Sequence, residues 1–157
     1  QKVRSGRVTI FMSPKYFVDT NILIYALDKH DPVKQDSARQ LLHLGAKKRE
    51  LSLSTQVLQE FYVAATRKLG VKTAAAKQMV SDFSIFETVT ISVELINEAI
   101  DCSALNTISF WDALIIVAAG SMNCAEIWSE DLNDGQLISG VLIRNPFKHF
   151  DELVSRF

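Results

Sequence analysis

The chain has 157 residues, of which 48% are hydrophobic and 22% are charged, and its formal net charge is −1. This composition is typical of one soluble globular domain, and no apolar run approaches the roughly twenty residues that span a bilayer. The lack of a positive net charge argues against an architectural nucleic-acid-binding protein, but it leaves room for an enzyme with a local basic rim.

The first residues and the cysteines indicate the limits of the domain and its compartment. No Met opens the chain, whereas Met12 lies just before the first apolar strand. We therefore expect residues 1–14 to be a non-native or disordered extension and residues 15–157 to form one domain. Cys102 and Cys124 belong to no CxxC motif. They predict two reduced thiols in a cytoplasmic protein, without a zinc site.

Strand and helix patterns alternate through the domain. An apolar strand at 15–19 precedes a brief helix at 22–27, for which Thr20 and Asn21 supply the cap. In chain order, the sequence then predicts a helix at 31–50, a strand at 51–53, a helix that Ser54 or Thr55 caps and that ends at Leu69, a helix at 73–86, a strand at 87–90, helices at about 92–105 and 110–122, strands at 125–128 and 141–143, and a C-terminal tail.

This alternation predicts an α/β fold, a three-layer sandwich in which helices flank a short, mainly parallel central sheet. Ligands of such sheets bind beyond the carboxyl ends of the strands. Asp19 follows the first predicted strand, and the acidic loop at 129–135 follows a later one.

Acidic residues in four separate stretches are candidates for a site, and each has a structural alternative. Asp19 could cap the following helix. Glu60 lies on or beside an apolar helix face, from which it could instead reach Arg67 or Lys68.

The other two stretches are equally ambiguous when each is taken alone. Asp112 and Ser109 fit a capping box at the start of a very apolar helix, and Trp111 between them is expected to pack in the core or wall. The loop at 129–135 holds three acids, and such loops are usually only solvated.

The joint occurrence of these acids points to a cation. Carboxylates brought close together raise one another's pKa, so a site that keeps several of them ionised needs a positive charge. Oxygen ligands without histidine or thiolate select Mg²⁺ or Mn²⁺. Such an ion activates water and stabilises charge on a phosphodiester.

Four motifs together resemble the PIN-domain nucleases, and among them the toxin component of VapBC-type toxin–antitoxin pairs. They occur in the family's order between Tyr16 and Phe147, and Asn145–Phe147 resembles the family's usual ending. The motifs are Phe17–Tyr25, Ser54–Tyr62, Ser109–Ile115 and Ile127–Gln136.

The resemblance implies a role for each candidate residue. Asp19 and Asp112 would be the principal metal ligands, and Glu60 and Asp131 would complete the acidic pocket. In the fourth motif, Glu130 or Asp134 could substitute for Asp131. The residues implied to orient these acids are Asn21, Ser109 and Ser129.

The resemblance also implies an activity and partners. Metal-activated hydroxide would cleave single-stranded or loop RNA and leave a 3′-hydroxyl and a 5′-phosphate. Toxins of this kind are normally homodimers, and the C-terminal segment of a cognate antitoxin covers the acidic site. Candidates for an RNA-binding rim, or simply for solvated helix ends, are Lys47, Lys48, Arg49, Arg67, Lys68 and Lys72.

Other functions remain open at this point. The chain could be a PIN-family RNA-processing nuclease without an antitoxin, or a non-catalytic PIN-like module that binds RNA or protein. A haloacid-dehalogenase-like phosphatase would need Asp-x-Asp where the sequence has Asp19-Thr20-Asn21. A receiver domain would need a phosphate-accepting Asp after a central strand, and the strand at 87–90 is followed by none.

Overall fold

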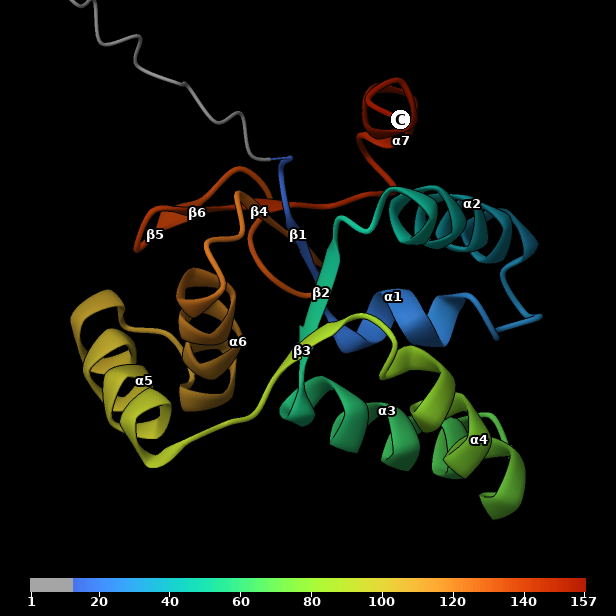
Figure 1. Cartoon of the computed structure of the whole chain (residues 1–157), viewed down its shortest axis with the longest axis horizontal. Helices are drawn as coiled ribbons and strands as arrows, with labels where there is room; N and C mark the ends of the chain where they lie inside the picture. Colours follow the sequence, from blue (N-terminus) through green and yellow to red (C-terminus); the bar gives the residue numbers. More distant parts are fainter. Residues whose placement is uncertain (1–12) are drawn as a thin grey trace, which may run out of the picture.

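The computed structural model describes residues 13–157, which form an α/β sandwich with a six-stranded sheet (Figure 1). In chain order the elements are β1 (Tyr16–Val18), α1 (Thr20–Tyr25), α2 (Pro32–Lys48), β2 (Leu51–Ser54), α3 (Thr55–Lys68), α4 (Thr73–Phe83), β3 (Glu87–Val89), α5 (Val93–Asn106), α6 (Phe110–Ser121), β4 (Glu126–Trp128), β5 (Leu137–Ile138), β6 (Val141–Arg144) and α7 (Phe150–Val154). The predicted extension at 1–14 lies, up to residue 12, outside the described residues.

The sheet has the strand order β3-β2-β1-β4-β6-β5, and all its neighbours are parallel except β5 and β6. The prediction of a mainly parallel α/β sheet is therefore confirmed. β1 and β4 are central and are buried along their whole length, as expected for parallel strands covered on both faces. Their register pairs Val18 with Trp128, so the two strands end side by side.

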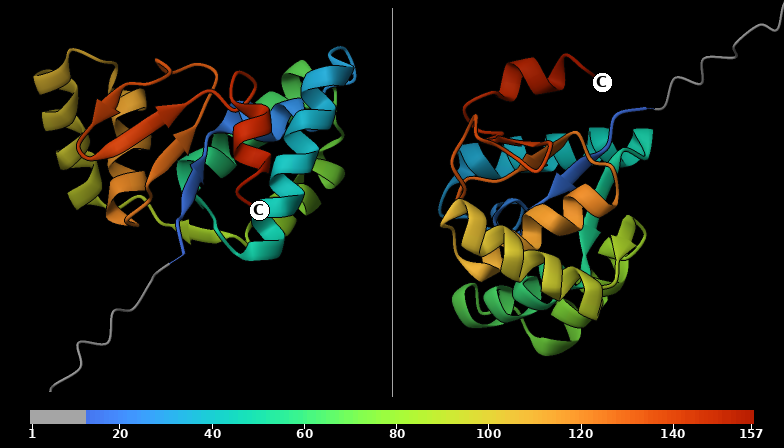
Figure 2. Two further views of the ribbon diagram at one scale, coloured as in Figure 1. Left: turned by 90° about the horizontal axis from the view of Figure 1, so that it is seen from above. Right: turned by 90° about the vertical axis from the view of Figure 1, so that its left-hand side faces the viewer.

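Helices cover both faces of this sheet. In two perpendicular views, α2 and α7 lie on one side and α3 to α6 on the other (Figures 1 and 2). α6 is the central helix of its layer, with every residue from 113 to 119 buried. An all-round apolar helix of this kind is stable only inside a core.

Several local predictions about these elements are wrong. The cap of the first helix is Asp19, as the alternative reading of that residue predicted, and not Thr20 or Asn21; α4 ends at Phe83 and not at 86. The supposed C-terminal tail contains α7, and the short strand β5 was not predicted.

Contacts of the last residues explain why the C-terminal segment is ordered. Arg156 forms an ion pair with the buried Glu126 at 2.9 Å. The ring of Phe157 packs edge-on against Tyr16 and Trp128, which stack on each other. The last residues of the chain are therefore held against β1 and β4, the two central strands.

Two further properties of the fold bear on the sequence predictions. Both cysteines are free and buried. Within residues 13–157 no single helix is long and apolar enough to cross a membrane, although α5 and α6, bent by 117° between them, together reach the length and composition of a span.

Candidate active site

The candidate site begins where β1 and β4 end. Asp19 follows β1 directly and its N–H donates to the carbonyl of Trp128 at 3.0 Å. Ser129 follows β4, and its hydroxyl donates to Asp19 Oδ2 at 2.7 Å. The pairing of the two central strands therefore brings the first and fourth motifs together.

Asp19 has both the capping contact and the contacts of a site residue. Its Oδ1 accepts the N–H of Thr20 at 2.7 Å, which caps α1. Its Oδ2 accepts from Asn21 Nδ2 at 3.1 Å in addition to the Ser129 hydroxyl. The carboxylate is buried, and residues from two motifs fix its orientation.

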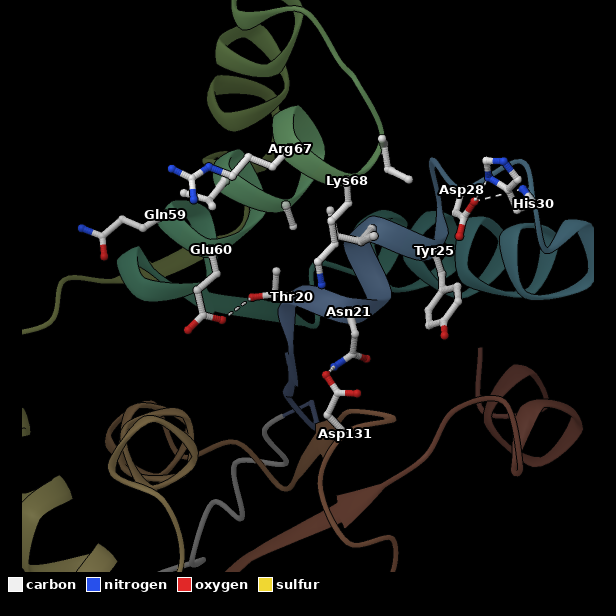
Figure 3. A pocket seen from close by; sticks show the side chains of 14 residues that line it. Thr20, Asn21, Tyr25, Asp28, His30, Gln59, Glu60, Arg67, Lys68 and Asp131 are labelled. Atoms are coloured by element: carbon white, nitrogen blue, oxygen red, sulfur yellow. Dashed lines mark hydrogen bonds and ion pairs between the residues drawn. The ribbon is translucent and has the colours of Figure 1, made fainter.

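Glu60 is turned into the site and not toward the basic end of its helix. Its Oε2 accepts from the hydroxyl of Thr20 at 3.0 Å, and its Oε1 accepts from Gln56 Nε2 at 2.9 Å (Figure 3 shows the first bond). Gln56 is itself buried and also donates to the carbonyl of Trp111 at 3.3 Å. One line of hydrogen bonds thus runs from Asp19 through Thr20 and Glu60 to the first turn of α6.

Asp131 reaches the same cluster through Asn21. Asn21 Nδ2 lies 3.2 Å from Asp131 Oδ2 and 3.3 Å from the Ser129 hydroxyl, and Figure 3 shows the side chains of Asn21 and Asp131 facing each other. The amide oxygen of Asn21, Oδ1, accepts the N–H of Glu130 at 3.1 Å. Asn21 is therefore the hub between α1 and the loop after β4.

Asp112 lies in the first turn of α6 and lines a different cavity from Glu60. Ser109 accepts its N–H at 3.1 Å, but the reciprocal half of the capping box is not formed, and no hydrogen bond joins the Asp112 carboxylate to another residue in 13–157. Asp112 lines a cavity of about 180 Å³ together with Asp131. Asp131 also lines a larger cavity of about 960 Å³ with Glu60. Asp131 therefore lines both cavities, one of them with Glu60 of the second motif and the other with Asp112 of the third.

The other two acids of the loop point elsewhere. Glu130 accepts from the Tyr25 hydroxyl at 2.8 Å and pairs with Lys34 at 2.8 Å. Asp134 accepts the N–H of Asn145 at 2.8 Å and lies 2.9 Å from His149 Nε2. Each is engaged away from Asp19, so the structure leaves Asp131 as the acid of this loop at the cluster.

Burial dominates the electrostatics of Asp19, whose pKa is raised from its ordinary 3.8 to about 6. The charges of Glu60 and Asp131 contribute to this rise, and the hydrogen bonds from Ser129 and Thr20 oppose it. Within residues 13–157, the side chains as they lie bring no three His, Cys, Asp or Glu groups within reach of one ion. The donor set nevertheless fits a hard cation, because a desolvated carboxylate beside two further acids lacks a positive partner.

Of the six candidate rim residues, Arg67 and Lys68 line the larger cavity, which they enter from the end of α3 (Figure 3). Lys47 and Lys48 end α2, which leads to the amino end of β2 and so to the opposite edge of the sheet. Trp111 is 62% exposed, so the prediction that it packs in the core or wall is wrong.

Sequence reasoning misses two residues that hold Glu60. Gln56 lies one helical turn before it, a spacing at which side chains on a helix meet, and this signal is available in the sequence. Thr20 is predicted only as a cap, and its contact with Glu60 spans 40 positions of sequence. No local pattern reveals such a pairing.

Comparisons with known proteins identify the family and the fold. A family model described as the PIN domain matches residues 16–133, well over half of the chain. No curated protein matches the sequence.

Three solved structures illustrate the shared fold. The crystal structure of VapC20 from Mycobacterium tuberculosis, described as a sarcin-ricin-loop-cleaving toxin, has a TM-score of 0.62 at 19% identity over 74% of this chain and 92% of that one. A toxin–antitoxin complex from Klebsiella pneumoniae gives 0.61 at 21% identity over 82% and 96%. DNA-bound VapBC from Salmonella typhimurium gives 0.62 at 19% identity over 84% and 98%.

The raised pKa of Asp19 predicts an unusual effect of Asp19→Asn on the metal-free protein. A buried acid whose pKa rises on folding adds stability below about pH 4, and this contribution is lost as the pH rises through 6. At pH 7 the ionised group costs on the order of 3 kcal/mol, which Asn avoids while it can still accept the Thr20 N–H. We expect the variant to be as stable as wild type or more so at pH 7, with the advantage shrinking toward pH 4.

Urea melts in EDTA between pH 4 and 7 measure this difference. In the variant, the Ser129 hydroxyl can turn and donate elsewhere, but Asn21 Nδ2 loses Asp19 Oδ2 as its acceptor. The gain in the free energy of unfolding is therefore smaller than the full electrostatic cost of the ionised group. A variant clearly less stable than wild type at pH 7 would show that Asp19 serves the fold and not a cation.

Proposed function

Because the chain belongs to the PIN-domain family, we propose that it is a metal-dependent endoribonuclease. The observation that carries the proposal is the buried Asp19 carboxylate, with its raised pKa, held beside Glu60 and Asp131. A scaffold without a ligand has no physical reason to desolvate one acid next to two others.

The residues that would hold Mg²⁺ or Mn²⁺ are Asp19, Glu60, Asp112 and Asp131. When bound, such an ion supplies an activated water and neutralises charge on a phosphodiester. The residues lining the two cavities include no cysteine and no serine paired with a histidine, so neither of these arrangements would supply a nucleophile without a metal.

The remaining side chains would orient the acids and the substrate. Asn21 and Ser129 fix Asp19 relative to Asp131, and Thr20 fixes Glu60. Ser109 caps α6 and so sets the direction of the turn that carries Asp112. Arg67 and Lys68 form the basic wall against which an RNA backbone would lie, at the end of α3.

Within this class we favour the toxin of a toxin–antitoxin pair, acting in the cytoplasm as a homodimer with a cognate antitoxin. Support comes from the solved structures with the same fold, one described as a sarcin-ricin-loop-cleaving toxin and another as a toxin–antitoxin complex. The alternatives are a PIN nuclease in RNA processing without an antitoxin and a non-catalytic PIN-like module. An adjoining antitoxin gene separates the first alternative from the toxin, and RNA cleavage separates the second.

Removal of metal tests the chemistry directly. We expect EDTA to abolish cleavage of a single-stranded RNA and either Mg²⁺ or Mn²⁺ to restore it, because the residues lining the cavities include no cysteine and no serine paired with a histidine that could act without a metal. Mn²⁺ should also raise the melting temperature of wild type but not of Asp19→Asn. Undiminished cleavage in excess chelator would exclude the proposed mechanism.

Asp112→Asn should reduce the cleavage rate by several orders of magnitude and leave the fold intact. The Ser109 hydroxyl caps α6 through the backbone N–H, which the substitution keeps, and the Asp112 carboxylate carries no structural hydrogen bond within 13–157. Rates at saturating Mg²⁺ and thermal melts measure the two effects. Asp101→Asn, an exposed acid on α5, is the matched control and should cleave normally. Normal cleavage by Asp112→Asn would remove it from the site.

Removal of the basic wall should weaken RNA binding without changing the metal site. We expect the double variant of Arg67→Gln and Lys68→Gln to raise KM, and to lower the salt slope of RNA affinity by about 0.7 for each phosphate that the protein no longer neutralises. The control pair Lys47→Gln and Lys48→Gln makes the same charge change at the opposite edge of the sheet. Equal effects of the two pairs would mean that only net charge matters.

A further inference from the structure

Glu130 stands next to Asp131 in the loop after β4, but its side chain is held on the other side of that loop. Its carboxylate lies 2.8 and 3.0 Å from Lys34 Nζ and 2.8 Å from the Tyr25 hydroxyl. Lys34 comes from the first turn of α2, and Tyr25 is the last residue of α1. One carboxylate therefore ties the loop to two helices.

The surroundings of this ion pair make it stronger than a surface pair. The Lys34 ammonium lies 4.8 Å from the centre of the Tyr25 ring and 5.4 Å from that of Phe147, and the two rings meet edge to face. The side chains of Lys34 and Glu130 are only 31% and 25% exposed. A partly buried pair against aromatic faces is screened less by solvent than an open one.

The position of Glu130 is coupled to that of Asp131 through the backbone. The N–H of Glu130 donates to Asn21 Oδ1 at 3.1 Å, and the N–H of Asp131 donates to the Ser129 hydroxyl at 3.1 Å. Adjacent Cα atoms are a fixed ~3.8 Å apart, so a shift of the Glu130 backbone changes the positions that the Asp131 backbone can take. Without its anchor, the start of the loop would depend on the hydrogen bonds that Asn21 and Ser129 make.

We propose that Glu130 and Lys34 form an anchor that positions Asp131 for cation binding. This proposal rests on the metal-dependent function proposed above. Glu130 is thus a positioning residue, not an alternative ligand in the fourth motif. Lys34 has a second effect, because it neutralises a carboxylate that would otherwise add repulsion beside Asp131.

An exchange of the two charges tests the anchor. Lys34→Glu and Glu130→Lys each place two like charges together, whereas the double variant restores an opposite pair. We expect each single variant to lose between about 10- and 100-fold in Mn²⁺ affinity, as when residues that orient metal ligands are changed. The double variant should recover most of that loss.

Three measurements on the full chain separate positioning from general damage. Mn²⁺ titration gives the affinity, amide hydrogen exchange gives the order of residues 129–133, and RNA cleavage gives kcat and KM. The single variants should speed exchange in that loop alone and lower kcat more than they raise KM. Lys15→Glu breaks the Lys15–Glu87 pair and is the matched control, which should change none of the three.

Glu130→Gln distinguishes an anchor from a ligand. Glutamine can still accept from Tyr25 and Lys34, so an anchor keeps its geometry and Mn²⁺ affinity stays within a few-fold of wild type, whereas removal of a ligand would abolish binding. Abolished binding in Glu130→Gln, or no recovery in the charge exchange, overturns the anchor. If the wild-type protein neither binds Mn²⁺ nor cleaves RNA, the proposed function itself is refuted, and this outcome is distinct from failure of the anchor.

Discussion

The structure of the site depends on one carboxylate that the fold removes from water. Asp19 is the first residue after a central strand, where the covering helices leave little access to solvent. Hydrogen bonds from Thr20, Asn21 and Ser129 compensate part of the lost hydration, but its pKa still rises from 3.8 to about 6. The remaining electrostatic strain is what a divalent cation would relieve.

The neighbours of Asp19 are arranged around this constraint in two groups. Thr20, Gln56 and Glu60 form a hydrogen-bonded line toward α6, and Asn21 and Ser129 lead toward Asp131. The first and fourth motifs are remote in sequence and meet because β1 and β4 are paired. Sheet topology therefore sets the positions of the residues that orient the acids as well as the positions of the acids themselves.

The loop after β4 is restrained at both of its ends. Glu130 ties its beginning to α1 and α2, and Asp134 ties its end to Asn145 and His149 in the segment that leads to α7. That C-terminal segment also packs on the central strands, where Arg156 pairs with Glu126 and Phe157 contacts Tyr16. The last residues therefore support the loop that carries Asp131, although they lie outside the 16–133 match to the family.

Local sequence determined the parts of this protein that depend on neighbouring residues. Apolar runs and caps such as Ser54 and Ser92 specify the helices and strands, and their alternation specifies the parallel α/β class. Four ordered motifs also identified the acids Asp19, Glu60, Asp112 and Asp131 as candidates. Local patterns do not reveal α7, because the contacts that order it are made with residues far away in the chain.

Only the tertiary structure decided where each acid lies and what it contacts. Three carboxylates crowd residues 130–134, and their spacing is too similar to rank them. The fold separates them, because Lys34 and Tyr25 engage Glu130, His149 engages Asp134, and Asn21 holds Asp131 at the cluster. Likewise, six basic residues are equivalent by sequence until the course of α2 and α3 places only two of them on the larger cavity. Long-range packing makes these choices, and no local pattern encodes it.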